Sequence, residues 1–173
     1  MYIRKAVLAD IPAIEKIYAD ARTFMRAHGN ETQWTDGYPS MMTGEDLARG
    51  QLYVCEKEAG AGPLAVFVYY IGEDPNYAKI EDGAWLSDAP YGVVHRIAVS
   101  ERAHGTGAAS FCLDWAFSKA GNLRIDTHED NIPMQRLLEK CGFRRTGMIH
   151  VEDGTERVAF QKTGGETKEQ ERA

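Results

Sequence analysis

One short stretch, Arg-Ala-His-Gly-Thr-Gly-Ala at residues 102–108, constrains the fold most strongly, because it lies between two segments of different periodicity. The β-branched run Val93 to Val99 predicts a strand before it, and the amphipathic residues 109–119 predict a helix after it. A glycine-rich turn at such a junction can direct free backbone N–H groups and the positive end of the helix toward one anion. The unit therefore predicts an α/β fold with an anion site where the helix begins.

Two common phosphate-binding loops do not fit this stretch. Gly105 and Gly107 are not followed by a third glycine at the offset of the dinucleotide fingerprint. No Gly-Lys-Ser or Gly-Lys-Thr of a Walker loop follows either. Since a strand-to-helix turn can need glycine for structural reasons alone, the interpretation depends on a second motif.

A second unit of strand, loop and helix occurs further along the chain. Residues 123–127 predict a short strand, and the next helix begins with Asn131 as its cap and Pro133 in its first turn. Gly142 lies where a helix commonly ends in a left-handed conformation. Two such units at this separation are more informative than either alone.

Together the two units resemble the GNAT superfamily of N-acyltransferases. The spacing Arg-x-x-Gly-x-Gly is similar to the acyl-CoA pyrophosphate loop of that superfamily. The opening of the chain, a strand over residues 2–6 and a capped helix from Asp10, is also typical of it. The second unit matches the C-terminal block of the superfamily in register at Asn131, Leu137, Glu139, Lys140, Gly142 and Phe143.

The resemblance covers about residues 1–162 and implies a single N-acetyltransferase domain. It implies a three-layer α/β fold with a mixed, splayed sheet of six or seven strands and about four helices. Residues 163–173 are polar and predict a frayed tail after the domain.

The resemblance also implies acetyl-CoA as co-substrate. A β-bulge beside the fourth strand would turn unpaired N–H groups of Ile97 to Val99 toward the pantetheine arm, with the Ala98 N–H as oxyanion donor. The remaining contacts would come from the glycine loop and from the cap of the later helix. The predicted cofactor-binding residues are Ile97, Ala98, Val99, Arg102, Ala103, His104, Gly105, Thr106, Gly107, Ala108 and Asn131.

The chain departs from the superfamily block at two positions, Met134 and Leu138. Leu138 replaces a tyrosine that is thought to protonate the leaving CoA thiolate in many members. Leucine has no proton to give, so either another group does this or none is needed. A thiol with a pKa of about 8.5 is a fair leaving group at neutral pH.

His95 is the first candidate for the general base, because it lies on the strand beside the expected acetyl site and the unperturbed pKa of histidine, about 6.5, suits neutral pH. Strand alternation places Arg96 on the opposite face unless the bulge shifts the register. His128 and Glu129, after the following strand, are rival bases. The simpler alternative for His95 is a structural role in its strand. For His128 and Glu129 it is a solvated loop.

The acceptor site is expected between loops rich in aromatic residues. Trp34, Tyr38 and Trp85, with Glu129, are the predicted substrate-binding residues, since aromatic faces and a carboxylate suit a cation. The loop Gln33 to Pro39 resembles that of small-molecule members, which favours a small amine. A protein N-terminal or lysine acetyltransferase, a non-catalytic acyl-CoA-binding module and an unrelated nucleotide-binding protein are the alternatives.

The acidic, turn-rich residues 72–90 predict a mobile loop or a lid over the acceptor site. Elsewhere the pattern predicts a helix over residues 43–49, a hairpin of strands over residues 52–58 and 64–70, and two final strands over residues 144–151 and 156–162.

The formal net charge of −6 disfavours nucleic acid as a partner and favours a cationic acceptor, although it also serves solubility. Three cysteines without metal-ligand spacing predict reduced thiols and no metal site. No secretion signal opens the chain and no apolar run approaches about 20 residues. We therefore expect a cytoplasmic monomer or homodimer without a membrane segment.

Overall fold

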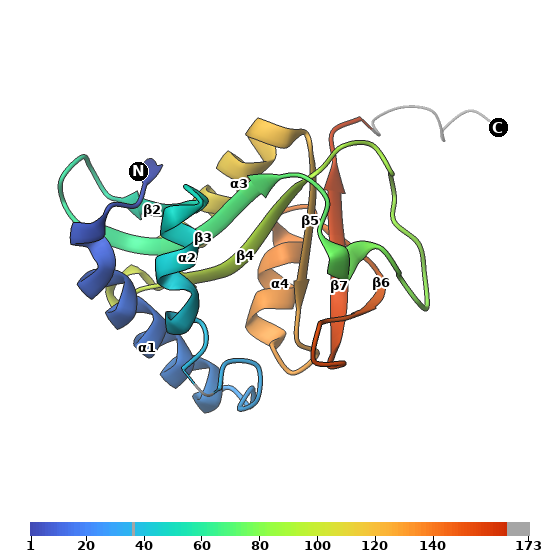
Figure 1. The fold of residues 1–173 in the computed structure, drawn as a ribbon, viewed down its shortest axis with the longest axis horizontal. Coiled ribbons are helices and arrows are strands. Elements are labelled where there is room, and N and C mark those ends of the chain that lie inside the picture. Colours follow the sequence, from blue (N-terminus) through green and yellow to red (C-terminus); the bar gives the residue numbers. More distant parts are fainter. Residues whose placement is uncertain (36, 166–173) are drawn as a thin grey trace.

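A computed structural model describes residues 1–35 and 37–165 (Figure 1). Four 3-10 turns connect the regular elements: Leu8–Asp10, Ser40–Met42, Pro75–Tyr77 and Glu101–Ala103. The helices and strands are β1 (Tyr2–Lys5), α1 (Ile11–Ala27), α2 (Thr43–Ala48), β2 (Leu52–Glu56), β3 (Pro63–Ile71), β4 (Gly92–Val99), α3 (Ala108–Ala120), β5 (Asn122–Thr127), α4 (Ile132–Lys140), β6 (Arg144–His150) and β7 (Glu156–Thr163).

One sheet of seven strands, in the order β1-β2-β3-β4-β5-β7-β6, forms the middle layer. Alternation along β3 places Ala65 and Phe67 in the core under α3 and α4, whereas Val66 and Val68 pack toward α1. The sheet is thus covered on both faces, and the predicted three-layer α/β fold is confirmed.

The strands β4 and β5 separate soon after they meet (Figure 1). They are parallel, and their register pairs only Gly92 with Leu123 and Val93 with Arg124 among the described residues. Beyond Val93, the edge of β4 that faces β5 has no strand partner in this part of the chain. The sheet is therefore splayed, as expected.

A β-bulge interrupts the pairing of β4 with β3 at the expected place. Val68 lies opposite His95 and Val66 lies opposite Ala98, so two residues of β4 face Phe67 alone. Arg96 has a φ of +50°, a left-handed conformation that is rare for a residue with a side chain. The bulge shifts the alternation of β4: Val94 and Ile97 both pack on the core cluster under α3, so His95 and Arg96 between them face the other side of the sheet.

Residues 72–90 do not form the expected mobile loop or lid, because they make specific contacts with β5, β6 and β7; Figure 1 shows only the path of the segment. Glu81 and Met148 form a β-bridge, and the fully buried Gln161 accepts a 2.6 Å hydrogen bond from the Leu86 N–H. The guanidinium of Arg124 lies 4.1 Å from the ring centroid of Trp85 and 4.0 Å from that of Tyr91. These buried contacts fix the segment in place.

Two smaller predictions also need correction. Asp10 does not cap α1 with its side chain; its carboxylate accepts the Val7 N–H at 2.8 Å and pairs with Arg4 at 2.7 Å. Thr163 does not belong to a frayed tail, because it is the last residue of β7 and pairs with Asn122. Residues 166–173 of the expected tail lie outside the described residues.

Candidate active site

A cleft of about 1430 Å³ passes through the sheet where β4 and β5 separate. The start of α3 and the first turns of α4 line it on one side of the sheet. The segment after α1 and the β6–β7 hairpin line it elsewhere, through residues such as Trp34, Tyr38 and Glu152. Every predicted cofactor-binding residue except Arg102 lies in its wall.

The glycine loop presents a set of free backbone donors to this cleft. The N–H groups of Ala103, His104 and Thr106 are used by internal turns. Among residues 1–35 and 37–165, no hydrogen bond engages the N–H groups of Gly105, Gly107, Ala108, Ala109 and Ser110. Gly105 and Gly107 have φ values of +75° and +83°, which glycine adopts without strain. The loop and the N-terminus of α3 can therefore bind an anion with several donors.

His95 is held by a buried carboxylate at the other side of the cleft. Its Nε2 atom lies 2.6 Å from Oδ2 of Asp74, which also accepts the hydroxyl of Tyr70 at 2.9 Å. Burial opposes ionisation of Asp74, but its hydrogen bonds, above all the one from His95, lower its pKa to about 2. An ionised carboxylate only accepts, so Nε2 of His95 carries a proton, and Nδ1 is the acceptor in the tautomer that this hydrogen bond selects.

A second carboxylate faces that acceptor nitrogen. Oδ1 of Asp126, on β5, lies 4.0 Å from Nδ1 of His95 and accepts the hydroxyl of Tyr77 at 2.6 Å. Burial raises the pKa of Tyr77 well above its ordinary value, so its hydroxyl stays a donor. His95 and Asp126 both line the cleft. The pair can hold a cation and take one of its protons.

Arg96 organises the neighbouring wall of the cleft. Its guanidinium makes a bidentate pair with Asp46, at 2.6 and 2.9 Å, and donates to the Tyr38 hydroxyl at 3.2 Å. Asp46 is buried. In the loop before α2, Trp34 packs edge-on against Tyr18 of α1, with the ring centroids 5.7 Å apart. The bulge of β4 thus fixes helix α2 and the loop before it against the site.

The loop after α1 also contacts the start of α4. The side chain of Asn131 caps α4, as predicted, by accepting the Met134 N–H at 3.3 Å. Its Nδ2 atom donates to Oε1 of Gln33 at 3.1 Å, and Asn30 donates to the same oxygen at 2.8 Å. Gln33 and Asn131 both line the cleft, so this contact joins two of its walls.

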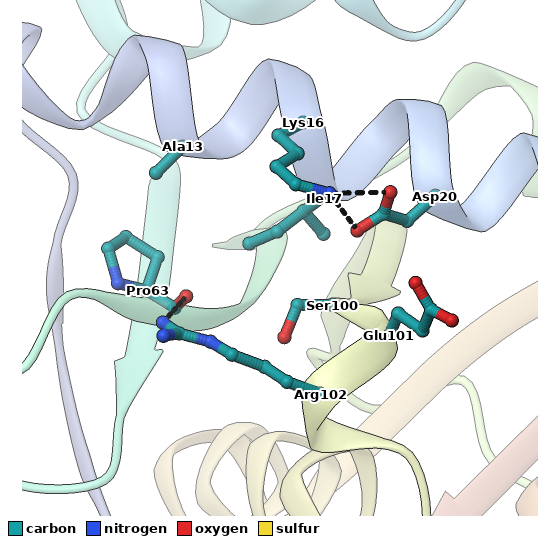
Figure 2. A pocket seen from close by; sticks show the side chains of 8 residues that line it. All are labelled: Ala13, Lys16, Ile17, Asp20, Pro63, Ser100, Glu101 and Arg102. Atoms are coloured by element: carbon teal, nitrogen blue, oxygen red, sulfur yellow. Dashed lines mark hydrogen bonds and ion pairs between the residues drawn. The ribbon is translucent and has the colours of Figure 1, made fainter.

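Three predicted site residues lie elsewhere. Arg102 donates to the Pro63 carbonyl at 3.1 Å and lines a separate cavity of about 350 Å³ beside α1 (Figure 2). Trp85 packs on Arg124 and Tyr77, outside the cleft. Glu129 is exposed and outside it as well, since the chain turns away from the sheet after β5. The rival base His128 contacts Asp130, also away from the cleft.

The sequence-based predictions missed Asp74, Asp126 and Tyr77. Alternation along β5 was a usable signal for Asp126, because its neighbours Ile125 and Thr127 face the other side. Asp74 and Tyr77 gave no such signal, since they belong to the segment expected to move. Leu138 is fully buried in the core under α3 and offers no proton.

Three further observations concern metal binding, membrane spans and cysteines. Among the described residues, no group of three His, Cys, Asp or Glu side chains could hold a metal ion. No helix in that part of the chain has the length and apolar character needed to cross a membrane. Cys55, Cys112 and Cys141 are free cysteines.

Comparisons with known proteins agree with this geometry. A GNAT acetyltransferase of Streptococcus agalactiae has 30% sequence identity and a TM-score of 0.84, over 95% of each chain. Ribosomal-protein-alanine N-acetyltransferase of Brucella melitensis has 20% identity and a TM-score of 0.60, over 94% of this chain and 99% of its own.

The NatC complex bound to Gag peptide and CoA includes a chain with 16% identity and a TM-score of 0.55, over 94% of this chain and 97% of its own. The chain matches none of the curated proteins. The family model described as "Acetyltransferase (GNAT) domain" matches residues 1–144. On this match, the chain belongs to the GNAT acetyltransferase family.

Proposed function

We propose that the protein transfers the acetyl group of acetyl-CoA to the primary amine of a small molecule, with His95 as general base. The observation that carries this proposal is the position of Nδ1 of His95. Asp74 fixes the proton on Nε2, so the free nitrogen faces Asp126 in the cleft of an acetyltransferase fold.

The coenzyme would occupy the part of the cleft nearer α3 and α4. The free N–H groups at the start of α3 suit its pyrophosphate, and the unpaired edge of β4 from Ile97 to Val99 suits its pantetheine amides. A helix N-terminus contributes about 0.3–2 kcal/mol toward an anion, whereas micromolar binding needs about 8 kcal/mol. The strand-like contacts must therefore supply much of the affinity. Ala98 pairs with Val66 two residues from the pair in which the Ser100 N–H donates to the Leu64 carbonyl, so the Ala98 N–H points to β3 and not, as expected, to the cleft. In this proposal another N–H, on the free edge of β4, holds the acetyl oxygen.

The acceptor would enter beside His95. Nδ1 of His95 and Oδ1 of Asp126 lie 4.0 Å apart, so an alkyl ammonium placed beside them, within hydrogen-bond distance of each, can donate to both atoms. Loss of one proton from an amine of pKa about 10.4 costs roughly 4.6 kcal/mol at pH 7. A positioned base contributes about 10² to 10⁴ in rate, or roughly 3–5.5 kcal/mol, which is the size required.

The chemistry then needs no covalent enzyme intermediate. His95 takes the ammonium proton at Nδ1, and Asp126 stabilises the resulting imidazolium. The neutral amine attacks the thioester carbon, and the oxyanion accepts a hydrogen bond from an N–H on the free edge of β4. His95 passes its first proton to solvent and then takes the second proton from the attached amine. The coenzyme leaves as thiolate when the carbon–sulfur bond breaks, and the product is an amide.

Two features support a small acceptor over a protein chain. The hydrogen bond from Asn131 to Gln33 joins two walls of the cleft. Trp34 and Tyr38 present aromatic surface beside Arg96, and the carboxylate of Asp126 supplies negative charge. The names of two structural neighbours refer to a ribosomal protein and a peptide, so protein N-termini are the competing acceptors.

Thiol release from acetyl-CoA in the presence of an amine panel tests this function. The panel contains small primary amines, amino acids, and short peptides with free N-termini, and product masses are measured. Small amines should accelerate thiol release in wild type and leave it at the background rate in His95→Gln. Preferred acetylation of peptides would overturn the small-acceptor proposal, and no acetylated product with any amine would overturn the transferase proposal. The cytoplasmic location and the monomeric or dimeric state remain predictions.

A further inference from the structure

One buried hydroxyl in the wall of the cleft has no partner. Oγ1 of Thr127, the last residue of β5, makes no hydrogen bond within residues 1–35 and 37–165, although the residue is 1% exposed. A buried hydroxyl without a partner costs about 1–3 kcal/mol. Such a group is expected to gain its partner from something that enters the cleft.

The strand alternation of β5 gives Thr127 a different position from Asp126. Ile125 belongs to the core cluster under α3 and α4, so Thr127, two residues later, faces that same side. Asp126 points the other way, to His95 and Tyr77. Thr127 therefore lies on the coenzyme side of the sheet, at the point where β5 has left β4.

Three other hydroxyls of the cleft, those of Thr106, Thr155 and Tyr38, already have partners. Thr106 donates to the Ala103 carbonyl at 2.7 Å, Thr155 donates to Asp153, and the Tyr38 hydroxyl accepts from Arg96. Leu138 is apolar and buried in the core. Thr127 thus has a free hydroxyl donor and is buried. It also lies on the wall along which the proposed function places the thioester.

We propose that Thr127 donates a hydrogen bond to the sulfur of the acyl donor and stabilises the thiolate as it leaves. This inference rests on the proposed acetyl transfer. When the tetrahedral intermediate collapses, the carbon–sulfur bond breaks and its electron pair stays on sulfur. Thr127 keeps its own proton and shares it through the hydrogen bond. The proton that completes the thiol comes from solvent, and the protons lost by the amine leave through His95.

Substitution by valine and serine separates this role from a structural one. Thr127→Val removes the hydroxyl with little change of shape, and Thr127→Ser keeps it. Thr146→Val is the matched control, because Thr146 also has a buried, unpartnered hydroxyl but lies outside the cleft. Single-turnover rates at saturating acetyl-CoA, calorimetric affinity for CoA, and the unfolding temperature are measured for each.

The expected result is a ten- to hundredfold lower single-turnover rate for Thr127→Val, about the effect of one hydrogen bond to a charged group. Its unfolding temperature should be equal to or above that of wild type, because an unsatisfied hydroxyl is lost. Its affinity for CoA should change less than threefold, Thr127→Ser should recover most of the rate, and Thr146→Val should keep the wild-type rate.

If the wild type is active, any one of three results would overturn the inference. They are an unchanged rate in Thr127→Val, a weaker CoA affinity with an unchanged rate at saturation, and an equal loss of rate and stability in the valine and serine variants. An inactive wild type would instead overturn the proposed function, and the inference with it. The two failures are therefore distinguishable.

Discussion

Nε2 of His95 and Oδ2 of Asp74 lie 2.6 Å apart, although the two residues belong to different segments of the chain. His95 is on the bulged strand β4, and Asp74 precedes the 3-10 turn Pro75–Tyr77 of the anchored segment. The N–H of Asp74 also donates to the Tyr91 hydroxyl at 3.1 Å. The tautomer of His95 is thus determined by a segment that is fixed to the sheet.

His95→Gln should reduce turnover by 10² or more, because it removes the only proposed acceptor for the ammonium proton. CoA affinity should remain within threefold of wild type, since His95 is proposed to lie at the acceptor. Steady-state thiol release across pH 6–9, together with calorimetry of CoA, checks this. A variant that retains more than a tenth of the wild-type turnover would rule His95 out as the base.

Asp74 should contribute to stability in a pH-dependent way. Its pKa is lowered to about 2 in the folded protein, below the ordinary value near 3.9 in an unfolded chain. The ionised form therefore stabilises the fold above about pH 4, by at most about 2.6 kcal/mol, and this contribution is lost as the pH falls from 4 to 2. Urea unfolding should show that the difference in free energy of unfolding between wild type and Asp74→Asn becomes smaller over this interval. A difference of constant size from pH 6 to pH 2 would contradict the pairing of Asp74 with His95.

Asp126→Asn should weaken binding of a cationic acceptor, because the amide keeps the Tyr77 hydrogen bond but loses the charge. KM for the amine should rise about tenfold, roughly 1.4 kcal/mol, with KM for acetyl-CoA little changed. Glu129→Gln is the control, since it removes an exposed carboxylate outside the cleft and should leave both constants unchanged. Equal effects from the two variants would point to long-range charge rather than a contact.

Gly105→Val and Gly107→Val should raise KM for acetyl-CoA at least tenfold. Each introduces a branched side chain at a positive φ, which strains the loop by about 1–2 kcal/mol and moves the free N–H groups. Gly60→Val is a matched control, because Gly60 has a φ of +82° in the turn before β3. It should lose similar stability and keep the wild-type KM. An unchanged KM in both loop variants would refute the phosphate assignment.

Leu138→Tyr should destabilise the protein by about 1–3 kcal/mol, because the larger ring does not fit a fully buried position. Restoring the tyrosine of the superfamily block should therefore bring no gain in turnover. Leu137→Tyr, at a half-buried position in the cleft wall, should cost less stability. Thermal unfolding of both variants measures the difference. A stable and faster Leu138→Tyr enzyme would show that the position opens into the site.

The sequence predicted the elements well where periodicity and turn residues agreed. The strand of Val93 to Val99, the helix after Gly107 and the hairpin at Gly154 lie where local chemistry places them. The bulge in β4 was expected only from the resemblance, and the left-handed Arg96 accounts for it. Local signals sufficed here because each depends on neighbours within a few residues.

The site was harder to predict because its contacts span long distances along the chain. Arg96 pairs with Asp46, fifty residues earlier, and Tyr77 reaches Asp126, forty-nine residues later. The polar composition of residues 72–90 suggested mobility, yet Trp85 and Gln161 anchor the segment. Local sequence patterns do not identify such distant partners, so Asp74 and Asp126 were missed, and Trp85, expected at the acceptor site, lies outside the cleft.

The most direct test is a crystal structure of the protein with CoA bound. We expect the pyrophosphate oxygens to accept the free N–H groups from Gly105 to Ser110, and the sulfur to lie in the gap between β4 and β5, near His95 and Thr127. CoA bound at any other surface, with the loop at residues 102–108 uncontacted, would contradict the proposed function.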